Sequence, residues 1–231
     1  MQRIANLVLK RLVPNASGTV LVEFAMSLPV LLLLFAGGSA LSDMIACNRK
    51  VTLATRTLAD LTSRTMSPSV VYNSPAAADA TTPLSASAVI MNPYRLDKAT
   101  QEIALLRVCD STHAYVVWSQ AQKQNSDGSA VTAATPSQTA GTLPGGGAQT
   151  SASIVAIPAN MVTAPMIPTS PDGSNVCQNL NPGTAAKTQV GTAGGYLFRS
   201  SITYNYSPSV AFITAAVTPM SDTIYMVPRL F

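Results

Sequence analysis

Two residues near the start of the chain have types and a spacing that suggest chemistry. Gly18 is followed five positions later by Glu23, and Glu23 lies at the entrance of a long apolar segment. From Phe24 to Ser42 no residue is charged, and as a helix this segment would be about 28 Å long at roughly 1.5 Å per residue. That length is close to the hydrocarbon thickness of a bilayer, about 30 Å. Because a carboxylate is costly in lipid, we interpret Glu23 as a functional residue.

The other residues that could do chemistry form no catalytic pattern. His113 is the single histidine, no Gly-x-Ser-x-Gly sequence accompanies it, and we expect it to be a solvated residue at a hairpin tip. No phosphate-binding Gly-x-x-x-x-Gly-Lys sequence occurs, and no Cys/His spacing suggests zinc. Asp172-Gly173-Ser174 indicates a plain turn. We therefore predict that the chain is not an enzyme and holds neither a metal nor a cofactor.

Charge is scarce and unevenly placed. Charged residues make up 10% of the chain, against about 25% in a typical soluble domain, which favours an exported protein over a cytoplasmic enzyme. The first 18 residues carry Arg3, Lys10 and Arg11 and no acid, which predicts a cytoplasmic N-terminus and an exported C-terminal part. Arg49 and Lys50, beyond the apolar segment, weaken this preference. The rest of the chain offers no basic face for nucleic acid.

The residues around Glu23 carry a resemblance to a known family. The sequence Gly18-Thr19-Val20-Leu21-Val22-Glu23-Phe24, which runs into an apolar helix, resembles the processing site of type IV prepilins. Together with Leu28-Pro29-Val30 it is similar to the TadE-like family, the minor pseudopilins of the tight-adherence (Tad, or Flp) pilus machinery of bacteria. The similarity covers roughly residues 16–50. The C-terminal half agrees only in its β-rich style and in Pro228-Arg229 near the end.

The resemblance implies a role in pilus assembly or its initiation. A prepilin peptidase would cut between Gly18 and Thr19, and Glu23 and Phe24 would serve recognition and assembly. The implied partners are the prepilin peptidase, other pilins and minor pseudopilins through the N-terminal helix, and inner-membrane lipid. The implied location is the inner membrane, with a single span, a periplasmic C-terminal domain and, after assembly, the pilus at the cell surface.

The proposed cleavage site also has a physical interpretation. Glycine before the cut lets an extended chain enter a protease cleft without a Cβ in the way. After cleavage Thr19 would carry a free ammonium, and Glu23 would lie one helical turn away on the same face. Since each charge is costly alone in an apolar bundle, an ammonium that meets Glu23 of a neighbouring subunit would set the axial register of packed helices.

Two other interpretations of the apolar segment stay open. It fits an ordinary signal anchor, with Glu23 at the interface by chance. It also fits a secretory signal peptide, because Gly38-Ser39-Ala40 offers small residues before a cut that would leave Leu41 at the N-terminus. In either case the chain would be an anchored or secreted periplasmic binding or hydrolytic protein unrelated to pili.

The predicted elements give an α+β fold, with an antiparallel sheet packed on the exported half of a long helix. Helical spacing of Val51, Ala54, Leu58 and Leu61 extends the apolar segment into one helix from about 20 to 65, and Pro29 should kink it. We expect a leader at 1–18, the helix at 19–65 with a transmembrane segment at about 20–42, a Pro-rich connection at 66–101, and an exported β-rich domain at 102–231 with a flexible loop at about 122–152.

Strand signals cluster in that last region. A hairpin is expected from 103–108 and 114–119, and further strands from Ser153–Ile157, Tyr196–Tyr206 and Asp222–Val227. A short strand at Ser87–Met91 is a weaker expectation, and 210–217 fits either a helix or a strand.

The three cysteines fit export. Cys109 and Cys177 both lie in the exported part and could form a disulfide in an oxidising compartment. The pair would close a loop of about 70 residues, worth roughly 4 kcal/mol in the chain-entropy model. Cys47 is left over, either buried in a helix interface or present as a free thiol.

Overall fold

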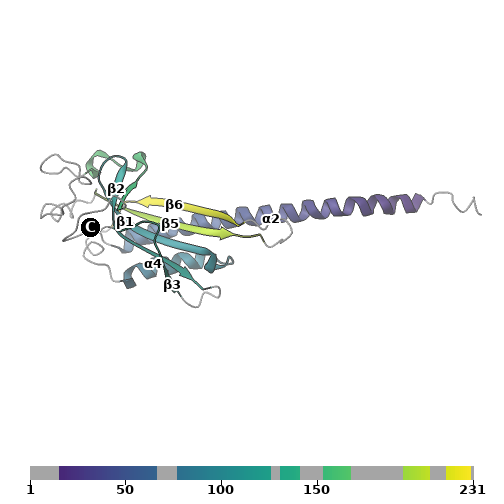
Figure 1. Ribbon diagram of the computed structural model, residues 1–231, viewed down its shortest axis with the longest axis horizontal. Coiled ribbons are helices and arrows are strands. Elements are labelled where there is room, and N and C mark those ends of the chain that lie inside the picture. Colours follow the sequence, from purple (N-terminus) through teal and green to yellow (C-terminus); the bar gives the residue numbers. More distant parts are fainter. Residues whose placement is uncertain are drawn as a thin grey trace, which may run out of the picture. The chain divides into compact units, whose positions relative to one another are not determined.

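A computed structural model of the chain describes residues 16–66, 77–125, 131–140, 153–167, 195–208 and 217–229. The fold is α+β, as predicted: a long N-terminal helix packs against an antiparallel sheet of six strands (Figure 1). The helices are α2 (Ala16–Thr65) and α4 (Ala77–Ile90), with 3-10 turns η1 (Leu96–Lys98), η3 (Ala159–Met161) and η4 (Ala164–Met166). The strands are β1 (Ala99–Val108), β2 (His113–Gln124), β3 (Val131–Ala134), β4 (Ile154–Ala156), β5 (Tyr196–Tyr206) and β6 (Thr218–Met226).

Helix α2 confirms the predicted long helix and runs without a break through Pro29. The bend expected at Pro29 stays a prediction. The chain divides into two compact units within this helix, since α2 up to Ile45 belongs to one unit and α2 from Ala46 belongs to the other, together with the sheet.

The second half of α2 buries one face made mostly of small residues. Cys47, Val51, Ala54 and Leu58 are fully buried and recur at three- and four-residue spacing, which places them on one side of the helix. The same face holds polar residues that are also buried, namely Thr55, Thr62 and Ser63. Their hydroxyls donate to carbonyls of α2 itself three or four residues earlier, at 2.6 to 2.9 Å. The helix therefore packs a close-fitting surface without leaving a buried hydroxyl unsatisfied.

The sheet has the strand order β3-β2-β1-β5-β6, with β4 paired to the start of β2. All pairs are antiparallel, and a bulge between Leu105 and Leu106 shifts the register of β1 against β2. Because successive side chains of a strand point to opposite faces of the sheet, each face carries alternate residues of every strand. One face forms a core with the 154–167 segment, through Ala104, Leu106, Val108, Ala114, Val116, Ile157, Met166 and Leu197.

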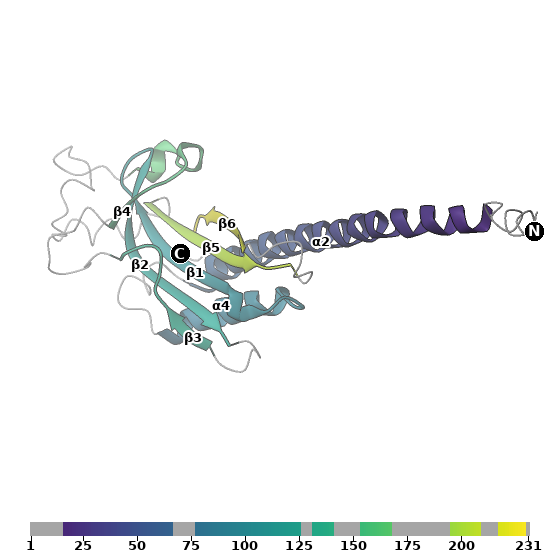
Figure 2. The same ribbon diagram turned by 45° about the vertical axis from the view of Figure 1, so that its right-hand side comes forward.

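The opposite face of the sheet carries Ile103, Leu105, Phe198 and Ile202, all fully buried. In both views the second half of α2 and helix α4 lie behind the sheet on one side (Figures 1 and 2). Burying such a side chain is worth about 1.5–3 kcal/mol relative to leaving it exposed. The sheet is thus covered on both faces, which explains why eight consecutive residues of β1, Gln101 to Val108, are buried.

The predicted Pro-rich connection at 66–101 is wrong for its central part. Helix α4 occupies Ala77–Ile90 with Pro83 inside it, and the strand expected at Ser87–Met91 does not form. A proline in a helix costs about 3 kcal/mol, so the pattern argued against a helix here. The helix forms nevertheless, because Leu84 and Ser87 on one of its faces are buried, as is Met91 directly after its end.

The predicted flexible loop at about 122–152 is also wrong in its first half. Strand β2 continues to Gln124 and β3 pairs with it, so that Ala121 opposes Ala134. The buried amide of Gln122 donates to Gln101 Oε1 at 2.8 Å, which fixes polar residues inside the sheet. The strands expected at 103–119, 153–157, 196–206 and 222–227 are confirmed, with the sheet beginning earlier, at Ala99. Residues 210–216 lie outside the described residues.

A buried carboxylate holds the segment after β3 against the sheet. Glu102, 4% exposed, accepts hydrogen bonds from the backbone N–H of Ser137 at 3.1 Å, the Ser137 hydroxyl at 2.6 Å and the backbone N–H of Gln138 at 3.1 Å. Arg199 Nη1 lies 3.4 Å away as the neutralising cation. Ser119 adds a bond from its hydroxyl to the Gln138 carbonyl at 2.7 Å. This cluster satisfies a charge that would otherwise be very costly to bury.

Replacing Glu102 with alanine should lower the free energy of unfolding by about 3 kcal/mol, because Arg199 and two backbone N–H groups lose their acceptor. Amide hydrogen exchange at 137 and 138 should rise in parallel. The matched control is Asp97→Ala, which removes an exposed carboxylate bonded to Arg95 at 2.9 Å and should cost less than about 1 kcal/mol. Equal losses for the two variants would contradict the assigned role of Glu102.

Candidate functional site

The predicted processing and assembly residues lie together on the first half of α2. Gly18, Thr19, Glu23 and Phe24 are all helical and all exposed, and Phe24 leaves 61% of its surface open. A Cβ placed on Gly18 would meet no atom within 4 Å. The fold therefore makes no steric demand for glycine at this position, and any demand must come from something that binds there.

The apolar residues around Glu23 are unusually exposed for a folded protein. Twelve large apolar side chains between Val20 and Phe35 are exposed, from 41% at Leu28 to 76% at Phe35. A soluble helix buries such residues, so this segment requires an apolar surrounding that lies outside the chain. Helix α2 is long and apolar enough to cross a membrane, on the basis of length and composition. A signal sequence near the N-terminus meets the same criterion.

Glu23 is the single charged group in this half of the helix before Asp43. Its carboxylate makes no ion pair with any residue that the structure describes. Thr19 lies four residues earlier, so the two Cβ atoms of this pair are about 5–6 Å apart on the same side of a helix. A positive charge placed at Thr19, or on a helix packed beside it, would be well positioned to neutralise Glu23.

The cysteines occupy two different surroundings. Cys109 is disulfide-bonded and lies at the end of β1, where it is 2% exposed. Cys177, its predicted partner, lies outside the described residues. Cys47 is a buried thiol on the packed face of α2, which agrees with the first of the two environments expected for it.

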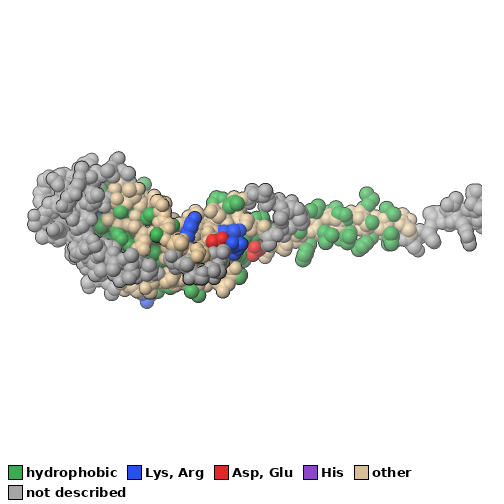
Figure 3. Space-filling model, turned by 60° about the horizontal axis from the view of Figure 1, so that its bottom comes forward, with side chains coloured by type: hydrophobic (Ala, Val, Ile, Leu, Met, Phe, Trp, Pro, Cys, Tyr) green, Lys and Arg blue, Asp and Glu red, His purple; other side chains and the backbone are tan. Residues whose placement is uncertain are grey.

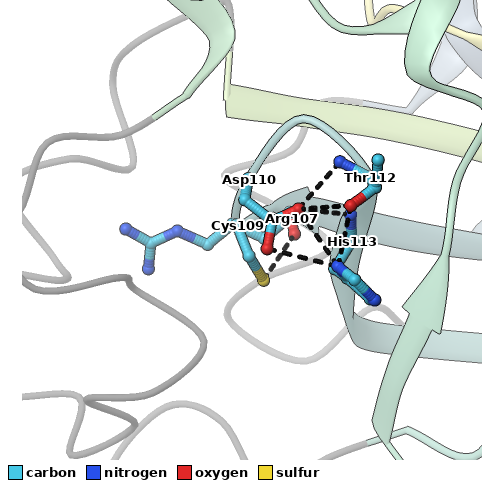
Figure 4. A network of polar contacts seen from close by, with 5 residues as sticks. All are labelled: Arg107, Cys109, Asp110, Thr112 and His113. Carbon is cyan, nitrogen blue, oxygen red and sulfur yellow. Dashed lines mark hydrogen bonds and ion pairs between the residues drawn. The ribbon is translucent and has the colours of Figure 1, made fainter.

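The lone histidine belongs to a turn between β1 and β2 (Figure 4). Asp110 Oδ1 accepts hydrogen bonds from the backbone N–H groups of Thr112 and His113, each at 2.7 Å. The ring nitrogen Nδ1 of His113 lies 3.1 Å from the same oxygen and 3.0 Å from the Thr112 hydroxyl. Arg107 and Cys109 border the turn, and Arg107 points away from the histidine. Within the described residues no hydroxyl or thiol is bonded to Nε2, so the geometry is that of a turn closed by an aspartate.

No group of three His, Cys, Asp or Glu side chains suited to a metal ion occurs among the described residues. Asp172-Gly173-Ser174, predicted to be a turn, lies outside them.

Sequence reasoning missed two ion pairs of the folded domain. One joins Glu102 to Arg199, as described above. The other joins Asp60 of α2 to Arg229 near the C-terminus, with Asp60 Oδ1 and Arg229 Nη1 3.3 Å apart. The backbone N–H of Arg229 also donates to the Ser63 carbonyl at 2.9 Å. Both pairs link residues distant in sequence, for which no local pattern gives a signal.

Comparison with known protein families, curated proteins and solved structures finds no match for this chain.

Asp110→Ala should lower the free energy of unfolding by about 1–2 kcal/mol, because two backbone N–H groups in the turn lose their acceptor. His113→Ala, the matched control in the same turn, removes a half-exposed ring and should change stability by less than about 0.5 kcal/mol. Thermal unfolding of the full chain in detergent measures both. A larger loss for His113→Ala than for Asp110→Ala would mean that the histidine has a role beyond the turn.

Proposed function

We propose that this chain is a minor pseudopilin of a tight-adherence pilus, held in the inner membrane until its N-terminal helix joins the growing fibre. The observation that carries the proposal is an exposed apolar half-helix that contains one carboxylate, Glu23, five residues after a glycine that the fold does not need. Lipid can cover the apolar residues, but it does not neutralise the charge. A bundle of similar helices can do both.

The helical position of Gly18 adds to the argument. It lies in the first turn of α2, and glycine in a helix is less stable than alanine by about 1 kcal/mol. The start of the helix is therefore the easiest part to unwind into the extended form that a peptidase cleft accepts. Cleavage after Gly18 would leave an ammonium on Thr19, four residues before Glu23.

In the assembled fibre the charge pair would act between subunits. A carboxylate in a membrane is costly, by about 2.5–3.5 kcal/mol at the centre and by less at the entrance, where Glu23 lies; an ammonium from a neighbouring helix reduces that cost only at one axial offset. Glu23 thus favours the assembled state over the membrane-embedded one and selects one register. Helix packing would supply the remaining energy.

The second candidate is an anchored or secreted periplasmic protein. It is favoured by the position of the first buried residue of α2, Cys47. A signal-peptidase cut after Ala40 would leave the whole packed face of the helix intact, so the exported domain would remain folded. The two candidates differ in the N-terminus that each predicts.

N-terminal sequencing of the protein from membranes, with and without a co-expressed Tad prepilin peptidase, should give a peptidase-dependent start at Thr19. Gly18→Ala should block that cut by at least tenfold. Gly37→Ala is the matched control, since a Cβ at Gly37 also meets nothing within 4 Å, and it should be cut normally. A start at Leu41, or an intact Met1 with the peptidase present, would refute the proposal.

Glu23→Gln should be cut at Thr19 but should enter the fibre at least tenfold less efficiently, because the neutral amide no longer pairs with the ammonium; tenfold corresponds to about 1.4 kcal/mol. The ratio of the protein in sheared pili to that in membranes measures the effect. Asp43→Asn, which changes the acid at the other end of the uncharged segment, is the control and should assemble normally. Equal incorporation of Glu23→Gln and the unmodified chain would contradict the pairing.

A further inference from the structure

The second half of α2 carries an outward face whose one ion pair with the rest of the described domain joins Asp60 to Arg229. This outward face consists of Arg49, Leu53, Arg56, Asp60 and Arg64, which recur at positions i, i+4, i+7, i+11 and i+15 on the side of the helix opposite the buried face. Leu53, which lies between Arg49 and Arg56 on this face, is 52% exposed. Basic, acidic and apolar side chains are visible side by side on one surface of the molecule (Figure 3).

Some charged residues of the outward face form ion pairs within the described structure and others do not. Asp60 is already bonded twice, to Arg64 at 3.0 Å and to Arg229 at 3.3 Å. Arg49 and Arg56 make no ion pair with any carboxylate among the described residues. The face therefore presents two arginines two helical turns apart with an exposed leucine between them, a pattern that an oppositely charged helix would complement.

Lipid headgroups do not fit this pattern. Leu53 and Arg56 lie 11 and 14 residues beyond Ser42, or about 16 and 21 Å along the helix at 1.5 Å per residue. The headgroup layer on one side of a bilayer is only about 5–8 Å thick. Headgroups would reach Arg49 through its long side chain, but not Leu53 or Arg56.

A second copy of this chain does not fit either. A parallel copy in register would place arginine against arginine. The acids of α2 are Glu23, Asp43 and Asp60, and no two of them are seven residues apart. Asp60, the acid within the outward face, is already paired.

We propose that the outward face binds a helix of a different protein that carries two carboxylates about seven residues apart with an apolar residue between them. The inferred helix would belong to a partner in the pilus assembly proposed above, so this inference rests on that proposal. The contact itself does not require cleavage at Gly18. The charges of Arg49 and Arg56 determine which helix binds and at which axial position, and Leu53 supplies an apolar contact between the two charges.

Site-specific photo-crosslinking of the full chain in its native host tests this inference. A photoreactive phenylalanine analogue replaces Leu53 or, as a matched control, Val89, which is 75% exposed on α4. The expected result is an adduct at position 53 and none at 89. Mass spectrometry should place the crosslinked peptide in another membrane protein, with two carboxylates about seven residues apart.

Charge reversal then tests the recognition itself. R49E and R56E together should reduce the adduct at least tenfold, and changing the two carboxylates of the crosslinked peptide to lysine should restore it. Both arginines are exposed, so thermal unfolding of the doubly reversed chain should be unchanged. An adduct with a second copy of this chain, an adduct with lipid, no adduct, or a yield insensitive to the reversal would each overturn the inference.

The N-terminus of the chain, sequenced in the same sample, separates this inference from the proposed function. A start at Thr19 without the partner adduct overturns the acidic-helix inference alone. A charge-dependent adduct on a chain that starts elsewhere overturns the pilus assignment alone.

Discussion

The packing of the second half of α2 against the sheet is the interaction on which the rest of the folded domain depends. Val51, Ala54 and Leu58 are fully buried on this side of the helix. Each pair of packed atoms is worth only about 0.1–0.2 kcal/mol, but a bulkier residue at a buried position would force the packed surfaces apart. The large side chains accordingly come from the sheet, as with Phe198 and Ile202.

A buried hydroxyl without a hydrogen-bond partner would destabilise the packing of that face, but the hydroxyls on it are hydrogen-bonded within α2 itself. Thr55 and Thr62 bond back to Val51 and Leu58 of the same helix, so they need no partner from the sheet. The helix thus keeps a small, partly polar surface that can be buried at little cost. The two halves of α2 therefore differ in the surroundings that they require. The first half, with large apolar side chains such as Leu34 and Phe35, requires an apolar surrounding, and the second half requires a close-packed one.

The parts of this fold that the sequence predicted are those with a local cause. Period and composition fixed α2, the β1–β2 hairpin and β5, because their apolar residues repeat at helical or strand spacing. Helix α4 was missed because its formation depends on burial, since Leu84 and Met91 outweigh Pro83. Strand β3 was missed because it has only four residues, two of them alanine, and forms by pairing with the end of β2. The Glu102–Arg199 pair joins residues 97 positions apart, so no local pattern could have indicated it. In contrast, the candidate site around Gly18 and Glu23 was fully visible in the sequence, because it lies within a single helix and uses no long-range contact.

The C-terminal segment is bonded to the second half of α2. Arg229 bonds through its side chain to Asp60 and through its backbone to Ser63, which lie five and two residues before the helix ends at Thr65. Strand β6 is held between this fastening and its ladder with β5. The folded domain is therefore linked to the second half of α2 in two ways, through the buried face of the helix and through the segment that follows the last strand.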